Sequence, residues 1–320
     1  MVEETSSKSC DRTKGTLVMA VRGIGQADDS PISKSAMLLV TACAVVSKDP
    51  VYARTFQDPY AAWFAAAISD EAAERLPTLD DLAARAAFIE ETERDLDGLV
   101  THVVYRKPWI TDRVRGALEA GIGQLVILGA GCDTLSLRLE KALAGVEVFE
   151  FDRTPVIDFR RRVLGQHGAL AENVRLLTID FDEDDLGTVL GANGFDRDKP
   201  AIIVAEAVVE YLTGDGVEGL FASARRMGAP DSRLIFTFLA NKVYEPGKFD
   251  TLRDRLDEGG ESLKFGLVPS EIEHFLDARG FRFLEMATPE TIEREIVPLV
   301  GAPVGIIPGW HLVLAERHMR

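Results

Sequence analysis

The stretch LVILGAGCDT, residues 125–134, decides the fold of this chain. It is a short apolar run that ends in Gly129-x-Gly131 and then becomes polar. Such a run is typical of a buried strand that turns sharply into a helix, and glycines let the turn approach a ligand because they carry no Cβ. The stretch therefore predicts a strand, a loop and a helix that cradle a nucleotide.

A second apolar run, VEVFEFD at residues 146–152, follows the glycine loop and ends in acidic residues. Carboxylates at this place can bind ribose hydroxyls. A nicotinamide-binding loop normally has a third glycine in the pattern G-x-G-x-x-G, and Thr134 stands there instead. The sequence thus disfavours a dehydrogenase, although a Gly-x-Gly pair also occurs in ordinary turns of parallel-sheet proteins.

From residue 125 onward the chain alternates between strand-like and helix-like segments. We expect strands at 125–129, 146–151, 174–179, 201–206 and 233–239, with helices at 133–143, 154–165 and 213–228 and a polar loop before the fourth strand. A helix from Pro108 to Leu118, with the proline at its start, precedes the first strand. A helix at 269–280 precedes two further strands, 281–286 and 310–315, which fit a terminal antiparallel pair. This alternation predicts an α/β fold with a doubly wound sheet.

The first third of the chain has helical spacing of its apolar residues, at 32–46, 61–68 and 79–99. We therefore predict a disordered polar tail over 1–14, a helical lobe over 15–104 that contributes to the ligand pocket, and a nucleotide-binding domain over 105–320. Residues 240–268 are polar and charged and indicate a helical insertion or lid on that domain.

The composition of the chain excludes several classes of binding partner. The formal net charge is -16, which disfavours nucleic acid and anionic membranes as ligands. The cysteines at 10, 43 and 132 have no metal-ligand spacing, so no metal is expected. Apolar stretches are shorter than the roughly 18 residues of a membrane span. These features predict a soluble, cytoplasmic protein.

Several motifs lie outward from the glycine loop in a fixed order. Together they resemble the leucine carboxyl methyltransferase family of S-adenosylmethionine-dependent O-methyltransferases, including its bacterial secondary-metabolite branch. The resemblance runs from about residue 28 to the C-terminus. The motifs are Asp28-Asp29-x-x-x-Ser33-Lys34, Asp58-Pro59-Tyr60, Tyr105-Arg106-Lys107-Pro108-Trp109, Glu150-Phe151-Asp152, Asp180-Phe181-Asp182 and VAEAVVEYL at 204–212.

The resemblance implies a class I methyltransferase sheet, with its Rossmann-like topology, and S-adenosyl-L-methionine as cofactor. Lys34 and Arg106 would hold the carboxylate of its methionine part, for which a guanidinium fork is well shaped. The glycine loop would lie against the cofactor, Asp152 would bind the ribose, and Asp180 with Phe181 would face the adenine. The cofactor-binding set implied is Lys34, Arg106, Gly129, Gly131, Asp133, Asp152, Asp180, Phe181 and Glu206.

Some of these residues also have structural interpretations. Asp152 could cap the following helix, and Lys34 could be an exposed helix residue. Asp58 could have no role other than to start a turn. Glu210 departs from the family, in which an apolar residue more often precedes the tyrosine. Glu210 and Tyr211 are the catalytic candidates, and Glu210 is either a general base or a solvated residue at the start of a helix.

The acceptor decides whether a base is needed, because a carboxylic acid is already ionised near pH 7 whereas a hydroxyl must lose a proton. The resemblance favours methyl ester formation on a small carboxylic acid in secondary metabolism. Protein carboxyl termini and hydroxyl acceptors remain alternatives, with Glu210, His102, His167, His274 and His311 as candidate bases. An NAD(P)-dependent oxidoreductase and a non-catalytic adenosyl-ligand-binding protein are the competing classes.

Overall fold

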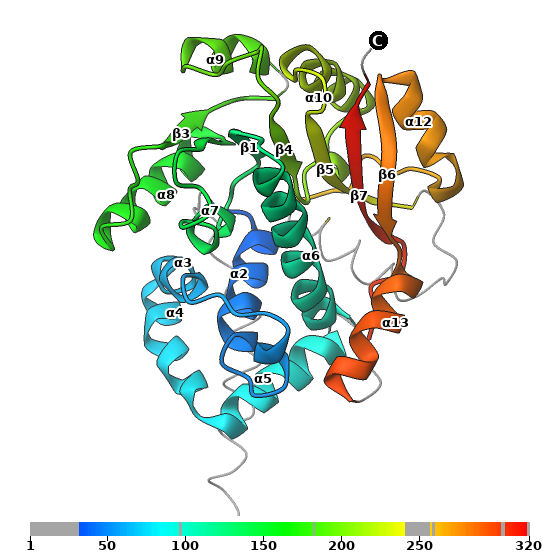
Figure 1. Cartoon of the computed structure of the whole chain (residues 1–320). Helices are drawn as coiled ribbons and strands as arrows, with labels where there is room; N and C mark the ends of the chain where they lie inside the picture. Colours follow the sequence, from blue (N-terminus) through cyan, green and yellow to red (C-terminus); the bar gives the residue numbers. More distant parts are fainter. Residues whose placement is uncertain are drawn as a thin grey trace, which may run out of the picture.

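The computed structural model describes residues 32–318 except 96–97, 182, 241–256, 258–259 and 302–304. The described residues form a seven-stranded sheet in the order β3-β2-β1-β4-β5-β7-β6 (Figure 1). Its strands are β1 (Gln124–Leu128), β2 (Glu147–Asp152), β3 (Val174–Thr178), β4 (Ile202–Ala205), β5 (Arg233–Leu239), β6 (Phe281–Ala287) and β7 (Trp310–Arg317).

Strands β1 to β5 are parallel, and β7 lies antiparallel between β5 and β6. The chain runs outward from β1 to β2 and β3, then returns to place β4 on the other side of β1. The strand order therefore reverses between β1 and β4, and ligands in such sheets bind at the carboxyl ends of the strands at this point. The predicted doubly wound sheet with a terminal antiparallel pair is confirmed.

Helices cover both faces of the sheet, as the two apolar clusters on opposite faces require. Figure 1 shows α2, α3, α4 and α5 grouped beside one end of the sheet. These helices are α2 (Lys34–Val46), α3 (Ala61–Ala67), α4 (Asp70–Arg75) and α5 (Leu82–Asp95), and α6 (Leu99–Glu119) joins them to β1. The other helices are α7 (Leu135–Arg138), α8 (Thr154–Gln166), α9 (Leu186–Ala192), α10 (Gly214–Met227), α12 (Ile272–Ala278) and α13 (Pro289–Val300). None of these helices is both long and apolar enough to span a bilayer.

Helix α6 corrects one prediction, because it begins at Leu99 and contains Pro108 in its interior. An internal proline costs a helix about 3 kcal/mol. The apolar side chains on both sides of it, Val103, Val104 and Ile110, are fully buried, and this burial outweighs the cost. Arg106 and Lys107 therefore lie in the middle of a buried helix and not in front of one.

Three further elements differ from the predictions. Helix α9 lies in the predicted polar loop, where Asp185 caps it by accepting from the backbone of Thr188. Helix α13 lies between the last two strands and begins with the cap Thr288 followed by a proline. The predicted helix over 133–143 is reduced to α7 and a series of turns. The predicted tail over 1–14 and most of the insertion over 240–268 lie outside the described residues.

The turn after β1 has the geometry that its glycines predict. Gly129 and Gly131 have φ of 64° and 45°, in the left-handed region. A Cβ on Gly129 would lie 2.6 Å from Cγ2 of Val208, in the loop after β4. The loops after β1 and β4 therefore touch where a side chain larger than hydrogen cannot fit.

We predict that Gly129→Ala lowers the free energy of unfolding by at least about 2 kcal/mol, because it adds a clash to the cost of a left-handed alanine. Gly145→Ala is the matched control, since Gly145 also has positive φ, 79°, but its added Cβ meets nothing within 4 Å. Urea denaturation measures both. Equal losses in the two variants would contradict the close contact between the two loops.

Candidate functional site

A cavity of about 420 Å³ lies at the carboxyl ends of β1 and β4. Its walls come from α2, α6, the loop after β1, the ends of β2 and β3, and the loop after β4. The wall contains most of the residues predicted from sequence, namely Arg106, Gly129, Gly131, Asp133, Asp152, Asp180, Phe181, Glu206 and Tyr211. Lys34 and Glu210 are not among the described lining residues.

Arg106 is the most deeply buried charge in this wall, with 0% of its surface exposed. Its Nε lies 2.7 Å from Oε1 of Glu206, at the end of β4, but the N–H does not point at that oxygen. Among the described residues, none of the three guanidinium nitrogens has a hydrogen-bond partner. A buried guanidinium that lines a cavity with open donors fits an incoming carboxylate.

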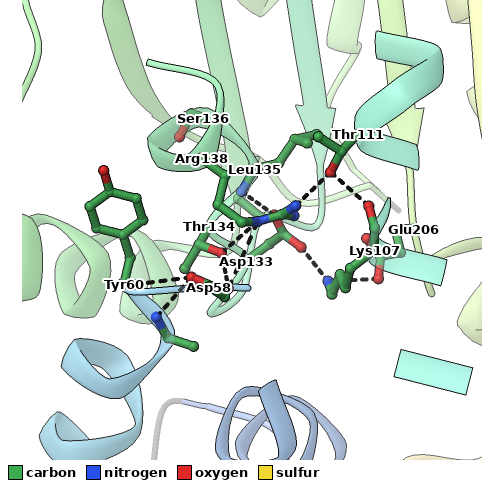
Figure 2. A network of polar contacts seen from close by, with 12 residues as sticks. Asp58, Tyr60, Lys107, Thr111, Asp133, Thr134, Leu135, Ser136, Arg138 and Glu206 are labelled. Atoms are coloured by element: carbon green, nitrogen blue, oxygen red, sulfur yellow. Dashed lines mark hydrogen bonds and ion pairs between the residues drawn. The ribbon is translucent and has the colours of Figure 1, made fainter. Parts of the chain in front are cut away.

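Lys107, the next residue, neutralises the acidic side of the wall. Its Nζ lies 2.7 Å from the same Glu206 oxygen and also pairs with Asp133 (Figure 2). Burial lowers the pKa of Lys107, but the two carboxylates outweigh it and hold the pKa above its usual value. Lys107 was not among the predicted site residues, although its position directly after Arg106 was a usable signal.

Asp133 stabilises the glycine loop from within. It pairs with Lys107, and its Oδ1 accepts from the backbone of Leu135 at 2.5 Å. Burial alone would raise the pKa of Asp133, but Lys107 and Arg138 hold it well below its usual range. Asp133 therefore stays ionised and lines the cavity as part of an ion-pair network (Figure 2).

Asp58 connects the helical lobe to this loop. Its Oδ1 accepts from the backbone of Tyr60 and of Ala61, both at 3.0 Å, at the start of α3. Its Oδ2 accepts from the hydroxyl of Thr134 at 2.5 Å, and Arg138 donates to Thr111 from the same cluster (Figure 2). The turn interpretation of Asp58 is thus correct but incomplete. Thr134 stands where the sequence lacks a third glycine, and it ties the loop to the lobe.

A fully buried ion pair lies under the glycine loop. Arg160 of α8 pairs with Glu150 of β2 at 2.5 Å. Its Nη1 also donates to the carbonyls of Ala130, Gly131 and Asp133, at 3.2, 2.9 and 2.8 Å. Arg160 therefore fixes the orientation of three carbonyl groups in the loop, a role that no local sequence signal indicates.

Asp152 ends β2 and lies against the glycine loop. Its Oδ2 accepts from the backbone of Gly131 and its Oδ1 from that of Arg153, both at 2.8 Å. Burial raises the pKa of Asp152, and this effect outweighs the two hydrogen bonds, which lower the pKa. It does not cap α8, whose N-cap is Arg153. The carboxylate thus lies beside the loop and in the cavity wall, as a ribose-binding residue requires.

The start of α2 differs from the prediction for Lys34. Lys34 contributes its backbone N–H, which donates to Oε1 of Glu261 at 2.5 Å. Ser33 and Ser35 line the cavity on either side of it. Glu261 was not predicted, because it lies 227 residues away in the chain and only the tertiary fold brings it there.

Glu210 lies behind the wall and not in it. It is 0% exposed, which contradicts the solvated interpretation, and its Oε1 accepts from the hydroxyl of Thr237 at 2.6 Å. Burial raises its pKa to about 7. Its neighbour Tyr211 does line the cavity, and burial raises the pKa of the Tyr211 hydroxyl above its usual value.

The candidate histidines have other surroundings. His102 lies beside Trp310 with its ring tilted by 44°, whereas His167 lies flat on Trp63 and His311 lies flat on Phe238. Burial lowers the pKa of both His102 and His311. None of the histidines is among the described residues that line the cavity.

The raised pKa of Glu210 predicts a pH-dependent stability. The folded state holds the proton more tightly than the unfolded state, so this contribution is complete below pH 4.5 and is lost as the pH rises through about 7. Glu210→Gln keeps the side chain neutral. We expect the variant to exceed the wild type in melting temperature at pH 8 and to match it at pH 4.5. Thermal melts at both pH values measure this, and a constant difference would contradict it.

Comparisons with known proteins agree with this geometry. The family model for leucine carboxyl methyltransferase matches residues 36–224. A Mycolicibacterium smegmatis protein provisionally named as an S-adenosyl-L-methionine-dependent methyltransferase is 28% identical over 85% of this chain and 90% of its own length. A Mycobacterium tuberculosis relative with a similar name is 30% identical over 69% of this chain and 72% of its own.

Other matches are shorter or concern the fold alone. A Mycobacterium marinum relative is 37% identical over 44% of this chain, and the match spans 45% of that relative. The crystal structure of a provisionally assigned methyltransferase from Thermobifida fusca superposes with a TM-score of 0.54 at 20% identity, covering 80% of this chain and 93% of that one. The sheet, the glycine loop and the family match agree with one another. The chain belongs to the leucine carboxyl methyltransferase family, with the class I fold of S-adenosylmethionine-dependent methyltransferases.

Proposed function

We propose that this chain is an S-adenosylmethionine-dependent O-methyltransferase that forms a methyl ester on a small carboxylic acid of secondary metabolism. One observation carries most of the proposal: the open guanidinium of Arg106 lies in the wall of a cavity at the strand-order reversal. That arrangement suits a ligand that carries a carboxylate next to a nucleoside.

The residues present fit the cofactor. Arg106 would hold the methionine carboxylate, and the backbone of Gly129 and Gly131 would lie against the ligand. Asp152 would bind the ribose, and Asp180 with Phe181 would contact the adenine, since all of them line one cavity. When bound, the cofactor supplies an activated methyl group on a sulfonium. The work of the chain is then to align the acceptor and to exclude water.

The carboxyl acceptor is favoured by the state of the acidic groups in the described wall. Asp58, Asp133, Glu206 and Glu261 are each engaged in hydrogen bonds or ion pairs. Histidine is absent from the described lining, so the wall offers no obvious base for a hydroxyl. A carboxylate acceptor is already ionised near neutral pH and needs none.

Lys264 offers a positive charge to such an acceptor. It lines the cavity from the segment after residue 260 and is exposed. No carboxylate among the described residues forms an ion pair with Lys264, although the chain has a formal net charge of -16 and is rich in carboxylates. Ser35, Tyr211 and Glu261 line the same cavity, so Lys264 is well placed to attract an anionic acceptor.

Replacing Arg106 tests cofactor recognition. We predict that Arg106→Ala raises the dissociation constant for S-adenosylmethionine about 100-fold, because the carboxylate of the ligand loses its charged donors. Isothermal titration measures the constant. Arg113→Ala is the control, since Arg113 lies two turns further along α6 and pairs with Glu285 outside the cavity. Unchanged affinity in Arg106→Ala would overturn the cofactor assignment.

The acceptor class is tested by the product. We expect transfer of labelled methyl groups to a panel of small carboxylic acids, with label released as methanol in mild alkali because esters hydrolyse and ethers do not. Lys264→Met should raise KM for the acid at least tenfold and leave cofactor affinity unchanged, while Lys141→Met, at an exposed position outside the cavity, should match the wild type. An alkali-stable product would instead establish a hydroxyl acceptor, and activity restricted to peptide carboxyl termini would establish a protein substrate.

A further inference from the structure

Ala207 has a backbone conformation that alanine rarely adopts. Its φ is 52°, in the left-handed region, and it directly follows Glu206 at the end of β4. Such a conformation costs about 1 kcal/mol or more and persists only where the surroundings hold it. Ala207 also lines the cavity, so whatever holds it also shapes the site.

Two buried side chains hold this turn. The backbone N–H of Ala207 donates to Oγ1 of Thr237 at 2.8 Å, and the hydroxyl of Thr237 donates to Oε1 of Glu210 at 2.6 Å. Thr237 thus accepts from Ala207 with a hydroxyl lone pair and donates its single hydroxyl proton to Glu210. Both side chains belong to residues that are 0% exposed, and Thr237 lies inside β5, paired with Leu312 of β7. The turn is therefore anchored to the middle of the sheet.

The two linked hydrogen bonds, from Ala207 to Thr237 and from Thr237 to Glu210, form a relay that affects two contacts of the cavity. Glu206, directly before Ala207, forms the ion pairs with Arg106 and Lys107. Val208, directly after it, lies against Gly129. A change at Ala207 would shift both the acidic partner of Arg106 and the packing of the glycine loop.

The backbone of Glu210 connects a third wall. Its carbonyl accepts from the N–H groups of Lys264 and Phe265, at 2.8 and 3.1 Å. The segment that carries Lys264 is thus fastened to the residue whose side chain anchors Ala207. One buried glutamate joins the loop after β4, strand β5 and the acceptor side of the cavity.

We infer that Glu210 is a positioning residue: through Thr237 it holds the left-handed turn at Ala207 and so aligns Glu206 and Val208 with the cofactor loop. Its effect on methyl transfer rests on the proposed function. Its hold on the turn does not. This role needs an acceptor oxygen at Oε1 but no proton transfer, and the carboxylate lies outside the described lining. Glu210 then acts on the reaction only through the geometry of its neighbours.

The relay predicts an ordered set of variants. Thr237→Val and Glu210→Leu, which remove the middle and the end of the relay, should each raise the dissociation constant for S-adenosylmethionine about tenfold. Their double variant should be no weaker than either single variant, because one relay is lost in each case. Glu210→Gln keeps the acceptor oxygen and should stay within about twofold of the wild type in both affinity and kcat. Thr101→Val is the matched control, since the buried Thr101 hydroxyl has no hydrogen-bond partner among the described residues.

A glycine rescue separates positioning from general damage to the fold. Glycine adopts positive φ at no steric cost, so Ala207→Gly should restore most of the affinity that Thr237→Val loses. Hydrogen exchange of the peptide over 206–212 measures the turn without any ligand. It should speed up in Thr237→Val and stay at the wild-type rate in Glu210→Gln.

The outcomes are distinct. Wild-type affinity and exchange in Thr237→Val would overturn the relay, and so would a Thr237→Val defect that Ala207→Gly leaves unchanged. A Glu210→Gln enzyme that binds cofactor normally but does not turn over would make Glu210 the base. If the wild type binds no S-adenosylmethionine, the proposed function fails, while hydrogen exchange still decides whether the relay holds the turn.

Discussion

The burial of one guanidinium, that of Arg106, is the constraint on which the site depends. A charge removed from water is strongly destabilised unless it is paired. Here Glu206 supplies the opposite charge to Arg106. Lys107 pairs with the same glutamate and with Asp133, so two cations face two carboxylates. Because these partners come from α6, β4 and the glycine loop, the requirement to neutralise Arg106 joins three elements at the strand-order reversal. The incomplete hydrogen bonding of Arg106 leaves this assembly open to a ligand carboxylate.

Buried ion pairs around this centre fix backbone as well as charge. Arg160 holds three carbonyls of the glycine loop while Glu150 compensates its charge. Asp58 and Thr134 tie the same loop to the helical lobe. Removing one partner of such a pair leaves an uncompensated buried charge, so these contacts favour a single loop geometry even where they add little net stability. A loop restricted in this way loses less conformational entropy when a ligand binds to it.

Sequence patterns predicted the sheet and the loop because these depend on local order. The run into Gly129 and Gly131 dictates a strand and a tight turn, and alternating apolar segments dictate the parallel strands. The start of α6 was not predicted, because burial of its apolar face outweighs Pro108. The place of Glu210 was not predicted either, since only tertiary packing puts Thr237 within 2.6 Å of it. Arg160 and Glu261 act across long sequence separations and have no local signature.

Contacts between distant segments also hold the proposed acceptor side of the cavity, but they are hydrogen bonds and not buried ion pairs. Glu261 contacts the start of α2, and the carbonyl of Glu210 fastens the segment that carries Lys264. The first of these contacts uses the side chain of Glu261, and the second uses backbone groups alone.

The proposed recognition of the cofactor carboxylate by Arg106 is the step on which the function of the site depends. It is tested most directly by changing the ligand and leaving the protein intact, with isothermal titration of the wild-type chain by S-adenosylmethionine and by its decarboxylated analogue. The analogue keeps the sulfonium, the amine and the nucleoside and lacks only the carboxylate. We expect the analogue to bind about 100-fold more weakly. Equal affinity for the two ligands would show that Arg106 does not recognise the carboxylate.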